Sequence, residues 1–433
     1  MGSNRQNDGP ILDYSCLSLK KILHRDFDLT GEKMLKKLKT SLLFLATLQT
    51  ACLVGDTYRV PATSDTVTLG LFDLNKKPAV KIKSGDIVSL ETWNSCLHEM
   101  VFNKTTPADV AKFYEKHDIQ KRRGMHSVTG PVYVEGAEPG DVLEIRILDI
   151  RLNDFGYNFL SPTQGILSDF TKPRIKYFKY NRNNNTTEFT KGVCLHLKPF
   201  PGVLAVAPPL DWPEGWPVNM QKEMGQPVAG EFNTVPPGPF AGNLDQPELQ
   251  AGSILFVPVF QKGGLVWTGD SHAMQSNGEV DVTALETSYE SIVLQFIVRK
   301  DLKAEAVTDK TKRKLGNAFS WPIIENETHW MIVGLNVDLF EAMKMATKNA
   351  IDFLVKTQGF TPEESYQFLS MVGDFVIAEA VNLIKNVTVH IPKEPFKANG
   401  KTCTLCSEGI FPIKALKIDE DAVCSPQEGI TVE

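Results

Sequence analysis

The sequence predicts a mainly β protein, built of sandwich or barrel units, with a C-terminal α+β unit. Three segments share one pattern, a Gly turn followed by an alternating or buried apolar run: KSGDIVSLET (83–92), EPGDVLEIRILDI (138–150) and LQAGSILFVPV (249–259). Such runs are typical of strands entered from tight turns. The sequence between residues 60 and 300 contains no strand–helix alternation, Gly-rich phosphate loop or nucleophile elbow, so a nucleotide-binding fold has no support.

The hydrophobic period changes beyond residue 335. Leu339, Met343, Ala346 and Ala350 are spaced for one face of a helix. A second helix is expected to begin at TPEE (361–364), which offers an N-cap threonine, a proline at the first helical position and a capping-box glutamate. Its apolar stripe continues to Val376, and VTVHIP (387–392) is expected to be a closing strand.

A chain of 433 residues is too long for one ordinary core, so two or three packed units are expected. We expect a β-rich catalytic region over 60–335, an α+β unit over 336–397 and a tail, 398–433, that hangs off the domain. The proline-rich stretch 199–247 is expected to be an ordered excursion over the surface, or part of a lid.

Composition excludes two classes of partner. The formal charge of −6 and the lack of a basic stripe interleaved with aromatic residues argue against nucleic acid. No run in the sequence reaches the roughly 18 apolar residues that a membrane-spanning helix needs, so the folded part is not expected to be an integral membrane protein.

The N-terminal region has the pattern of an export signal. Met34 begins MLKKLKTSLLFLATLQTAC, a basic segment followed by the apolar run 42–48 and small residues before Cys52. The last residues fit a lipoprotein cleavage box, except that Gln49 stands where an aliphatic residue is usual. The protein is therefore expected to be periplasmic or anchored by a lipid at Cys52; the alternative is an amphipathic helix in a cytoplasmic protein. Residues 1–33 are then either a real extension or an over-long gene start.

Three of the seven cysteines lie in the tail: Cys403, Cys406 and Cys424. In an exported protein two of them would form a disulfide and leave one thiol over. As a zinc knuckle the set is one ligand short. In a cytoplasmic protein three free thiols are the better interpretation.

Four ordered motifs carry a resemblance to a known family. The chain contains TGPVYVEGAEPGD (129–141), PGVLAVAP (201–208), AGNLD (241–245) and GDSHAMQSNGE (269–279), and the sequence resembles the acetamidase/formamidase family over roughly residues 66 to 394. The resemblance implies hydrolysis of the C–N bond of a small aliphatic amide to a carboxylic acid and ammonia, in a mostly β fold with a C-terminal α+β unit. The substrate would be the small amide, and a homo-oligomer is expected.

An amide hydrolase needs an activated water or nucleophile, a group that stabilises the oxyanion, and an acid for the leaving nitrogen. No Ser or Cys of this sequence lies in a convincing nucleophile motif, so water activated by a divalent metal, with zinc as the expected ion, fits better. Asp270 and His272 lie two residues apart and would share one strand face as metal ligands.

Glu279 is a candidate catalytic residue whose position depends on local structure. If Asn277 and the following glycine form a tight hairpin, Glu279 lies about 13 Å along the strand from His272 and the two cannot act together. If residues 273–278 curl as a loop, they can. Both interpretations stay open.

Other polar residues complete the predicted site. Of Glu135 and Glu138, which would point to opposite faces of a regular strand, we favour Glu138 as a catalytic residue. His126 is a candidate substrate contact or a structural histidine, and Asn243 and Asp245 are candidates for binding the amide or ordinary turn residues.

Two positions depart from the family pattern. Asn94 and Asn277 stand where the family usually has aspartate, and asparagine binds a divalent cation more weakly and cannot act as a base. Asn94 and the nearby His98 are retained as candidate substrate-binding residues, because His98 offers a compensating side chain. The rival hypothesis is a metal- or ligand-binding β protein of the same fold that has lost catalysis.

Overall fold

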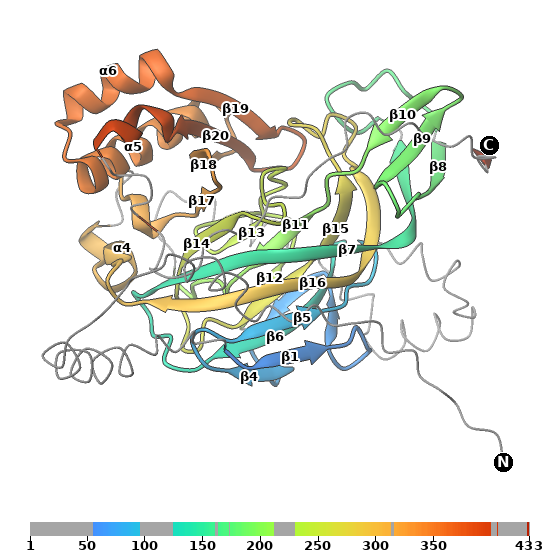
Figure 1. Cartoon of the computed structure of the whole chain (residues 1–433), viewed down its shortest axis with the longest axis horizontal. Coiled ribbons are helices and arrows are strands. Elements are labelled where there is room, and N and C mark those ends of the chain that lie inside the picture. The colour runs from blue at the N-terminus through green and yellow to red at the C-terminus, as the bar shows by residue number, and fades with distance from the viewer. Residues whose placement is uncertain are drawn as a thin grey trace, which may run out of the picture. The chain divides into compact units, whose positions relative to one another are not determined.

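The computed structural model describes residues 55–95, 124–160, 163–172, 174–211, 230–312, 316–399, 405 and 431–432 (Figure 1). Leu53–Glu433 form one compact unit. Within the described ranges no helix has both the length and the apolar character needed to cross a membrane. The cysteines at 52, 403, 406 and 424, and His98, lie outside the described residues.

Strands dominate, which confirms the predicted mainly β class. Within the described residues, 17 strands join one hydrogen-bonded network, and β9–β10 and β3–β12 form two separate ribbons. The strands are β1 (Thr57–Val60), β2 (Val67–Leu69), β3 (Leu71–Asp73), β4 (Val80–Ile82), β5 (Ile87–Leu90), β6 (Ser127–Val134), β7 (Val142–Leu160), β8 (Arg174–Lys179), β9 (Thr186–Thr190), β10 (Val193–His196), β11 (Phe200–Ala205), β12 (Glu231–Asn233), β13 (Ala241–Asn243), β14 (Ile254–Pro258), β15 (Val266–Met274), β16 (Leu285–Arg299), β17 (Ile323–Glu325), β18 (His329–Asn336), β19 (Asp374–Glu379), β20 (Lys385–Pro392) and β21 (Thr431–Val432).

The three predicted turn-to-strand entries are confirmed as the starts of β5, β7 and β14. In the second of them Gly140 has a φ of 94°, which glycine adopts without strain. Asp141 fixes this turn, because its carboxylate accepts the backbone N–H of Glu138 at 3.0 Å. The long strands β7 and β16 then pair antiparallel over most of their length and form the spine of the β region.

Strand β15 is the element on which the site is built. Along one edge it pairs with β11. Along the other edge it pairs first with β6, up to the pair Gly269–Val128, and then with β16, from the pair Ser271–Thr287. The neighbour therefore changes at residue 270.

The stretch expected as a surface excursion is corrected in its described parts. All six residues of β11 are buried, and β11 lies between β13 and β15. Residues 232–234 and 236–247 are also buried throughout. Prolines had suggested exposure, but Pro201 occupies a central strand at a position paired with Ser271.

The C-terminal unit contains helices α5 (Leu339–Gln358) and α6 (Pro362–Val372), as the sequence predicts. The capping box between Thr361 and Glu364 is confirmed, and VTVHIP lies in β20. The predicted helical stripe to Val376 is wrong at its end, because Gly373 caps α6 in an extended conformation and the chain continues as β19. Three short helical segments, α4 (Glu305–Thr308), Lys310–Lys312 and Ala318–Ser320, precede this unit, and Glu394–Asn399 follows it.

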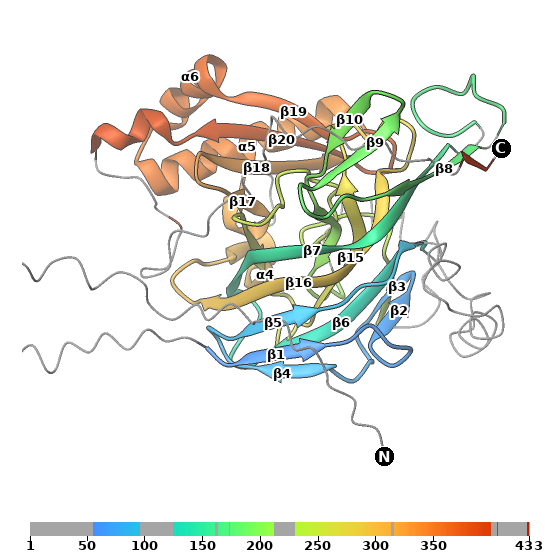
Figure 2. The same ribbon diagram turned by 45° about the vertical axis from the view of Figure 1, so that its right-hand side comes forward.

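The C-terminal unit packs onto the β region through a shared core. Strand β17 pairs with β14 on one side and β18 on the other, and β18 pairs with β20. Trp330 and Phe353 pack in the same hydrophobic cluster as Ile254 of β14. Helices α5 and α6 lie on the side away from β1 and β4 (Figures 1 and 2).

Two described parts of the tail are tied to the domain. Leu405 is buried in that same cluster, and Thr431 pairs with Lys176 of β8. The expectation that residues 398–433 hang off the domain is therefore corrected for these residues.

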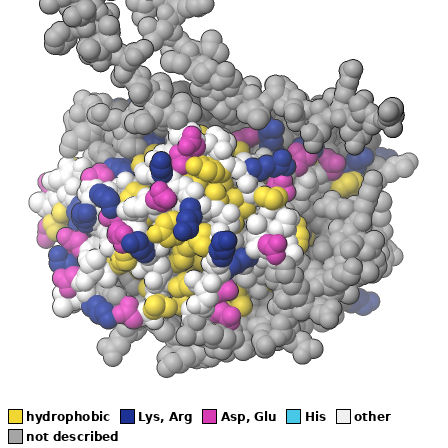
Figure 3. Space-filling model, turned by 90° about the horizontal axis from the view of Figure 1, so that it is seen from below, with side chains coloured by type: hydrophobic (Ala, Val, Ile, Leu, Met, Phe, Trp, Pro, Cys, Tyr) yellow, Lys and Arg dark blue, Asp and Glu magenta, His cyan; other side chains and the backbone are white. Residues whose placement is uncertain are grey.

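The face seen in Figure 3 carries Lys and Arg side chains interspersed with Asp and Glu among apolar patches. Among the described residues of this face there is no continuous basic surface of the kind that nucleic acids require.

Candidate active site

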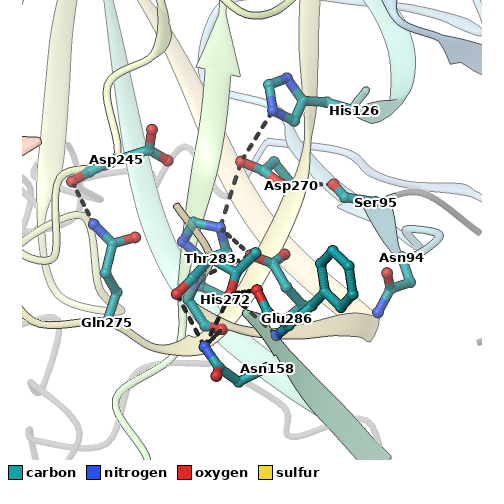
Figure 4. A network of polar contacts seen from close by, with 12 residues as sticks. Asn94, Ser95, His126, Asn158, Asp245, Asp270, His272, Gln275, Thr283 and Glu286 are labelled. Atoms are coloured by element: carbon teal, nitrogen blue, oxygen red, sulfur yellow. Dashed lines mark hydrogen bonds and ion pairs between the residues drawn. The ribbon is translucent and has the colours of Figure 1, made fainter. Parts of the chain in front are cut away.

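Asp270 and His272 lie on β15 at the point where its neighbouring strand changes. Asp270 occupies the position between the two pairings and has a φ of 50°. Its carboxylate accepts a hydrogen bond from Ser95 Oγ at 2.6 Å and lies 3.4 Å from His272 Nε2. The two residues are therefore together, as their spacing predicts, and Figure 4 shows His126, Ser95 and His272 converging on Asp270.

The backbone of His272 is held by a buried tyrosine. Tyr289 Oη accepts the backbone N–H of His272 at 3.1 Å and lies 2.9 Å from its carbonyl oxygen and 2.5 Å from that of Phe200. The His272 ring, 1 % exposed, packs edge-on against the Phe200 ring at 5.1 Å. Tyr289 thus fixes the backbone of His272, and Phe200 fixes the position of its ring.

Glu279 reaches the cluster because residues 275–284 form a long loop between β15 and β16 and not a tight two-residue turn. Strand β15 ends at Met274 and β16 begins at Leu285. Glu279 is buried with a φ of 42°, and its side chain falls within one group of possible ligands with Asp245 and His272. Asn158 of β7 pins the loop by donating to Thr283 Oγ1 at 2.9 Å (Figure 4). Of the two interpretations left open by the sequence, the curled loop is the one observed.

Glu286 is a site residue that sequence reasoning missed. It lies opposite His272 in the β15–β16 pairing, and its Oε1 is 3.6 Å from His272 Nε2. The same oxygen accepts the backbone N–H of Ala284 at 3.0 Å. Only the strand register reveals this neighbour, because thirteen residues of sequence, including the loop, separate His272 from Glu286.

Asp245 approaches the cluster from the turn after β13. It is buried, has a φ of 46°, and receives a hydrogen bond from Asn382 Nδ2 on its Oδ2 at 2.9 Å. Gly202 of β11 makes this approach possible. A methyl group added there would lie 2.6 Å from Asp245 Oδ1, from Asp270 Oδ2 and from His272 Cε1.

Three of these acids have left-handed backbone conformations. Asp245, Asp270 and Glu279 all have positive φ, which is uncommon outside glycine and costs of order 1 kcal/mol or more at each position. Such strain persists where the surrounding fold imposes it, and it concentrates at functional sites.

Several buried carboxylates lie close together around one imidazole, and their mutual repulsion and burial shift their pKa values. Burial and the neighbouring Asp270 raise the pKa of Asp245 well above its usual range, and burial and Asp245 do the same to Glu279. Burial raises the pKa of Glu286 to about 7 although His272 opposes this.

The pKa values of His272 and Asp270 shift in the directions expected for an ion pair. Burial opposes charge on the imidazole, but Glu286 and Asp270 outweigh it and raise the pKa of His272 to about 10. Burial also opposes ionisation of Asp270, yet His126 and His272 hold its pKa below the usual range. One imidazolium cannot balance this many carboxylates, so the cluster must bind protons or a cation.

The donor set fits a divalent cation. Two groups have ligand atoms within 4.8 Å of one another, Asp270–His272–Glu286 and Asp245–His272–Glu279. Within the described residues, His272 Nδ1, Asp245 Oδ1 and Glu286 Oε2 are buried without a hydrogen-bond partner, and His272 Nε2 faces only the carboxylates of Asp270 and Glu286. Buried polar atoms are rarely left so, and imidazole with carboxylates is a zinc donor set.

Three predicted substrate contacts lie at or near this cluster. His126 Nε2 is 3.7 Å from Asp270 Oδ2, and its Nδ1 is 3.1 Å from Thr234 Oγ1. Asn94 is buried and accepts a hydrogen bond from Tyr157 Oη at 3.0 Å, while its Nδ2 has no partner within the described residues. Asn243 is buried on β13 next to Asp245, with its Oδ1 likewise unpaired there.

Two predicted positions are not brought to the cluster. Glu138 lies in the turn after β6, with a side chain 51 % exposed and 3.4 Å from Lys262. It follows the far end of β6, whereas Asp270 is next to the pair formed by Val128 near the start of that strand. We therefore do not retain Glu138 as a catalytic residue. Asn277 is exposed at the loop tip and is not a ligand.

A strained, buried centre of one imidazole and several carboxylates is the arrangement of an enzyme active site. Known proteins with similar sequences are enzymes as well. The family described as Acetamidase/Formamidase matches residues 72–398, and the chain therefore belongs to this family. Membership makes the protein an amidase, an enzyme that hydrolyses amides.

Individual relatives have low sequence identity to this chain, but they match it over long segments. An acetamidase of Mycolicibacterium smegmatis is 26 % identical over 299 residues, which is 56 % of this chain and 72 % of the relative. A formamidase of Methylophilus methylotrophus is 25 % identical over 327 residues, or 63 % and 77 %. The crystal structure of an acetamidase from Bacillus halodurans superposes with a TM-score of 0.61 at 26 % identity, covering 79 % of this chain and 99 % of that one.

Proposed function

We propose that this amidase hydrolyses small aliphatic amides, of the formamide or acetamide type, to the carboxylic acid and ammonia. The observation that carries the proposal is the buried imidazole–carboxylate centre in a member of this family. The relatives named acetamidase and formamidase support the size of the substrate.

We further propose that a divalent cation, with zinc as the expected ion, is held by Asp270, His272 and Glu286 or by Asp245, His272 and Glu279. When bound, such an ion lowers the pKa of a coordinated water and stabilises the developing oxyanion. The carboxylates gathered around the His272 ring support this proposal, because a bound cation would replace the proton that otherwise balances their charge.

The chain's own residues supply the remaining chemistry. Burial and Asp245 raise the pKa of Glu279 well above its usual range, which favours the protonated carboxyl group. If the ion is held by Asp270, His272 and Glu286, Glu279 is the proposed acid that protonates the departing nitrogen. Asn94 Nδ2 and Asn243 Oδ1 have no partner among the residues that the structure describes, and we propose that they donate to the substrate carbonyl and accept from its NH₂ group, respectively. His126 at the edge of the cluster is a third proposed substrate contact.

The experiment is ammonia release from formamide, acetamide and longer amides, measured with the purified protein before and after removal of metal and after addition of Zn²⁺. Turnover that depends on Zn²⁺ supports both proposals. Turnover that is unaffected by chelation removes the metal proposal, and no turnover on any amide removes the substrate proposal.

A rival function has one specific observation in its favour. Asn94 stands where the family usually has aspartate. It is buried and accepts a hydrogen bond from Tyr157, so a neutral side chain is a stable part of this site. A protein of this kind that binds a metal or ligand without catalysis would take up Zn²⁺ and release no ammonia in the same experiment.

We also propose that the protein is exported and carries a lipid at Cys52, which lies outside the described residues. The signal pattern that starts at Met34 supports this, as does the disulfide at Cys194, since disulfides persist in oxidising compartments. Expression from Met34 in a bacterial host, with fatty-acid labelling of the parent and of Cys52→Ser, tests it. An unprocessed cytoplasmic product would contradict export. A homo-oligomer, also proposed, is tested by light scattering.

A further inference from the structure

The C-terminal unit reaches the active site through the turn between β19 and β20. Gly278 N–H donates to the carbonyl of Ala378 at 2.8 Å, and Ala380 N–H donates to the carbonyl of Gly278 at 3.3 Å. A parallel bridge thus joins Gly278 to Glu379. The loop that carries Glu279 is therefore held by a strand more than ninety residues later in the sequence.

The same turn holds Asp245. Asn382 Nδ2 donates to Asp245 Oδ2 at 2.9 Å, whereas Oδ1 of that carboxylate has no partner within the described residues and lies over Gly202 beside His272. One oxygen is anchored and the other is presented to the cluster. Because Asp245 has a strained backbone, this anchor fixes which way the carboxylate points.

Hydrogen bonds within the β19–β20 turn hold Asn382 in place. Glu379 Oε1 accepts the backbone N–H groups of Val381 and Asn382, each at 2.5 Å. On the other side of Asp245, Asn386 Nδ2 donates to the carbonyl of Leu244 at 2.8 Å, and Thr388 Oγ1 donates to Gln246 Oε1 at 2.8 Å. The C-terminal unit thus forms a hydrogen bond with each residue of the segment 244–246.

We infer that Asn382 is a positioning residue of the active site, which orients the Asp245 carboxylate, and that the C-terminal α+β unit completes the site. The inference rests on the proposed function, because it assigns Asn382 a role in that reaction. It predicts that losing the amide donor affects the site more than the fold, since Asn382 is half-buried.

The test compares Asn382→Leu and Asn382→Ala with the control Leu383→Ala. Leu383 lies in the same turn with 45 % exposure. Loss of a partner that orients a ligand lowers metal affinity or activity by about 10- to 100-fold. We therefore expect Zn²⁺ affinity and kcat on formamide to fall by that factor in both Asn382 variants, with KM within about twofold, as for a group that acts on the reacting geometry. The control should match the parent, and all variants should melt near the parent temperature.

Two results separate this inference from the function. If the parent releases no ammonia, the proposed function fails, and Zn²⁺ affinity alone decides the inference. If the parent also binds no Zn²⁺, crystal structures of the parent and Asn382→Leu decide it through the direction of the Asp245 carboxylate. Parent-like Zn²⁺ affinity and kcat, or an unmoved Asp245 carboxylate, would overturn the inference.

Discussion

Gly202→Ala tests directly whether the site depends on the close approach of β11. The added methyl would lie 2.6 Å from each of three groups, Asp245 Oδ1, Asp270 Oδ2 and His272 Cε1, and ordinary contact begins at 3.4 Å, so each must retreat by about 0.8 Å. Gly202 does not have a positive φ, so the backbone itself accepts alanine. A displacement of this size at reacting groups costs about 100-fold in rate.

The assay is kcat and Zn²⁺ affinity, with the melting temperature as the measure of stability. Overpacking costs about 1–3 kcal/mol of unfolding free energy. Gly373→Ala is the matched control, because its methyl would be crowded at 2.9–3.2 Å by Leu369 and Val389, in the C-terminal core. We expect both variants to lose stability and only Gly202→Ala to lose activity. Parent-like kcat and Zn²⁺ affinity in Gly202→Ala would refute the placement of the site.

Three further predictions follow from the cluster and its surroundings. His272→Ala should abolish Zn²⁺ binding and ammonia release and, because the buried ring leaves a cavity, lower the unfolding free energy by about 2–4 kcal/mol; retained turnover would remove this residue from the mechanism. Asn94→Asp should raise Zn²⁺ affinity, whereas Asn277→Asp, at an exposed position, should change neither affinity nor kcat; equal effects would contradict the assigned positions. Burial lowers the pKa of His390, so the unfolded chain binds the proton more tightly and stability should fall as pH drops below about 6.5. His390→Gln should weaken this dependence in melts between pH 5 and 8; an unchanged slope would show that other groups cause it.

Local pattern was enough to predict the mainly β class, three strand entries, one closing strand, the helix pair and the pairing of Asp270 with His272. Those features depend on residues two to four positions apart, where periodicity is informative. Glu286 could not be predicted, because its proximity to His272 depends on the register across a ten-residue loop. Asn382 could not be predicted either, since its contact with Asp245 spans 137 positions.

The wrong choice of Glu138 has a physical reason. Alternation along a strand tells which face a side chain takes but not which end of the strand lies at the site. Strand β6 enters the site at its first residues, near Val128, and leaves it well before Glu138. The predicted surface excursion is wrong in its described parts for a related reason, because proline content does not predict burial when neighbouring strands cover the segment.

The reach of the β19–β20 turn means that the site is completed late in the synthesis of the chain. Ser95, Asp245, Glu286 and Asn382 enter the nascent chain far apart, and the last of them is made only when some nine-tenths of the chain exists. Until β19 and β20 have docked, the loop before Glu279 lacks its bridge and Asp245 lacks its anchor. A chain that ends before β19 and β20 therefore has most of the residues of the site but lacks the contacts that hold Asp245 and the loop of Glu279.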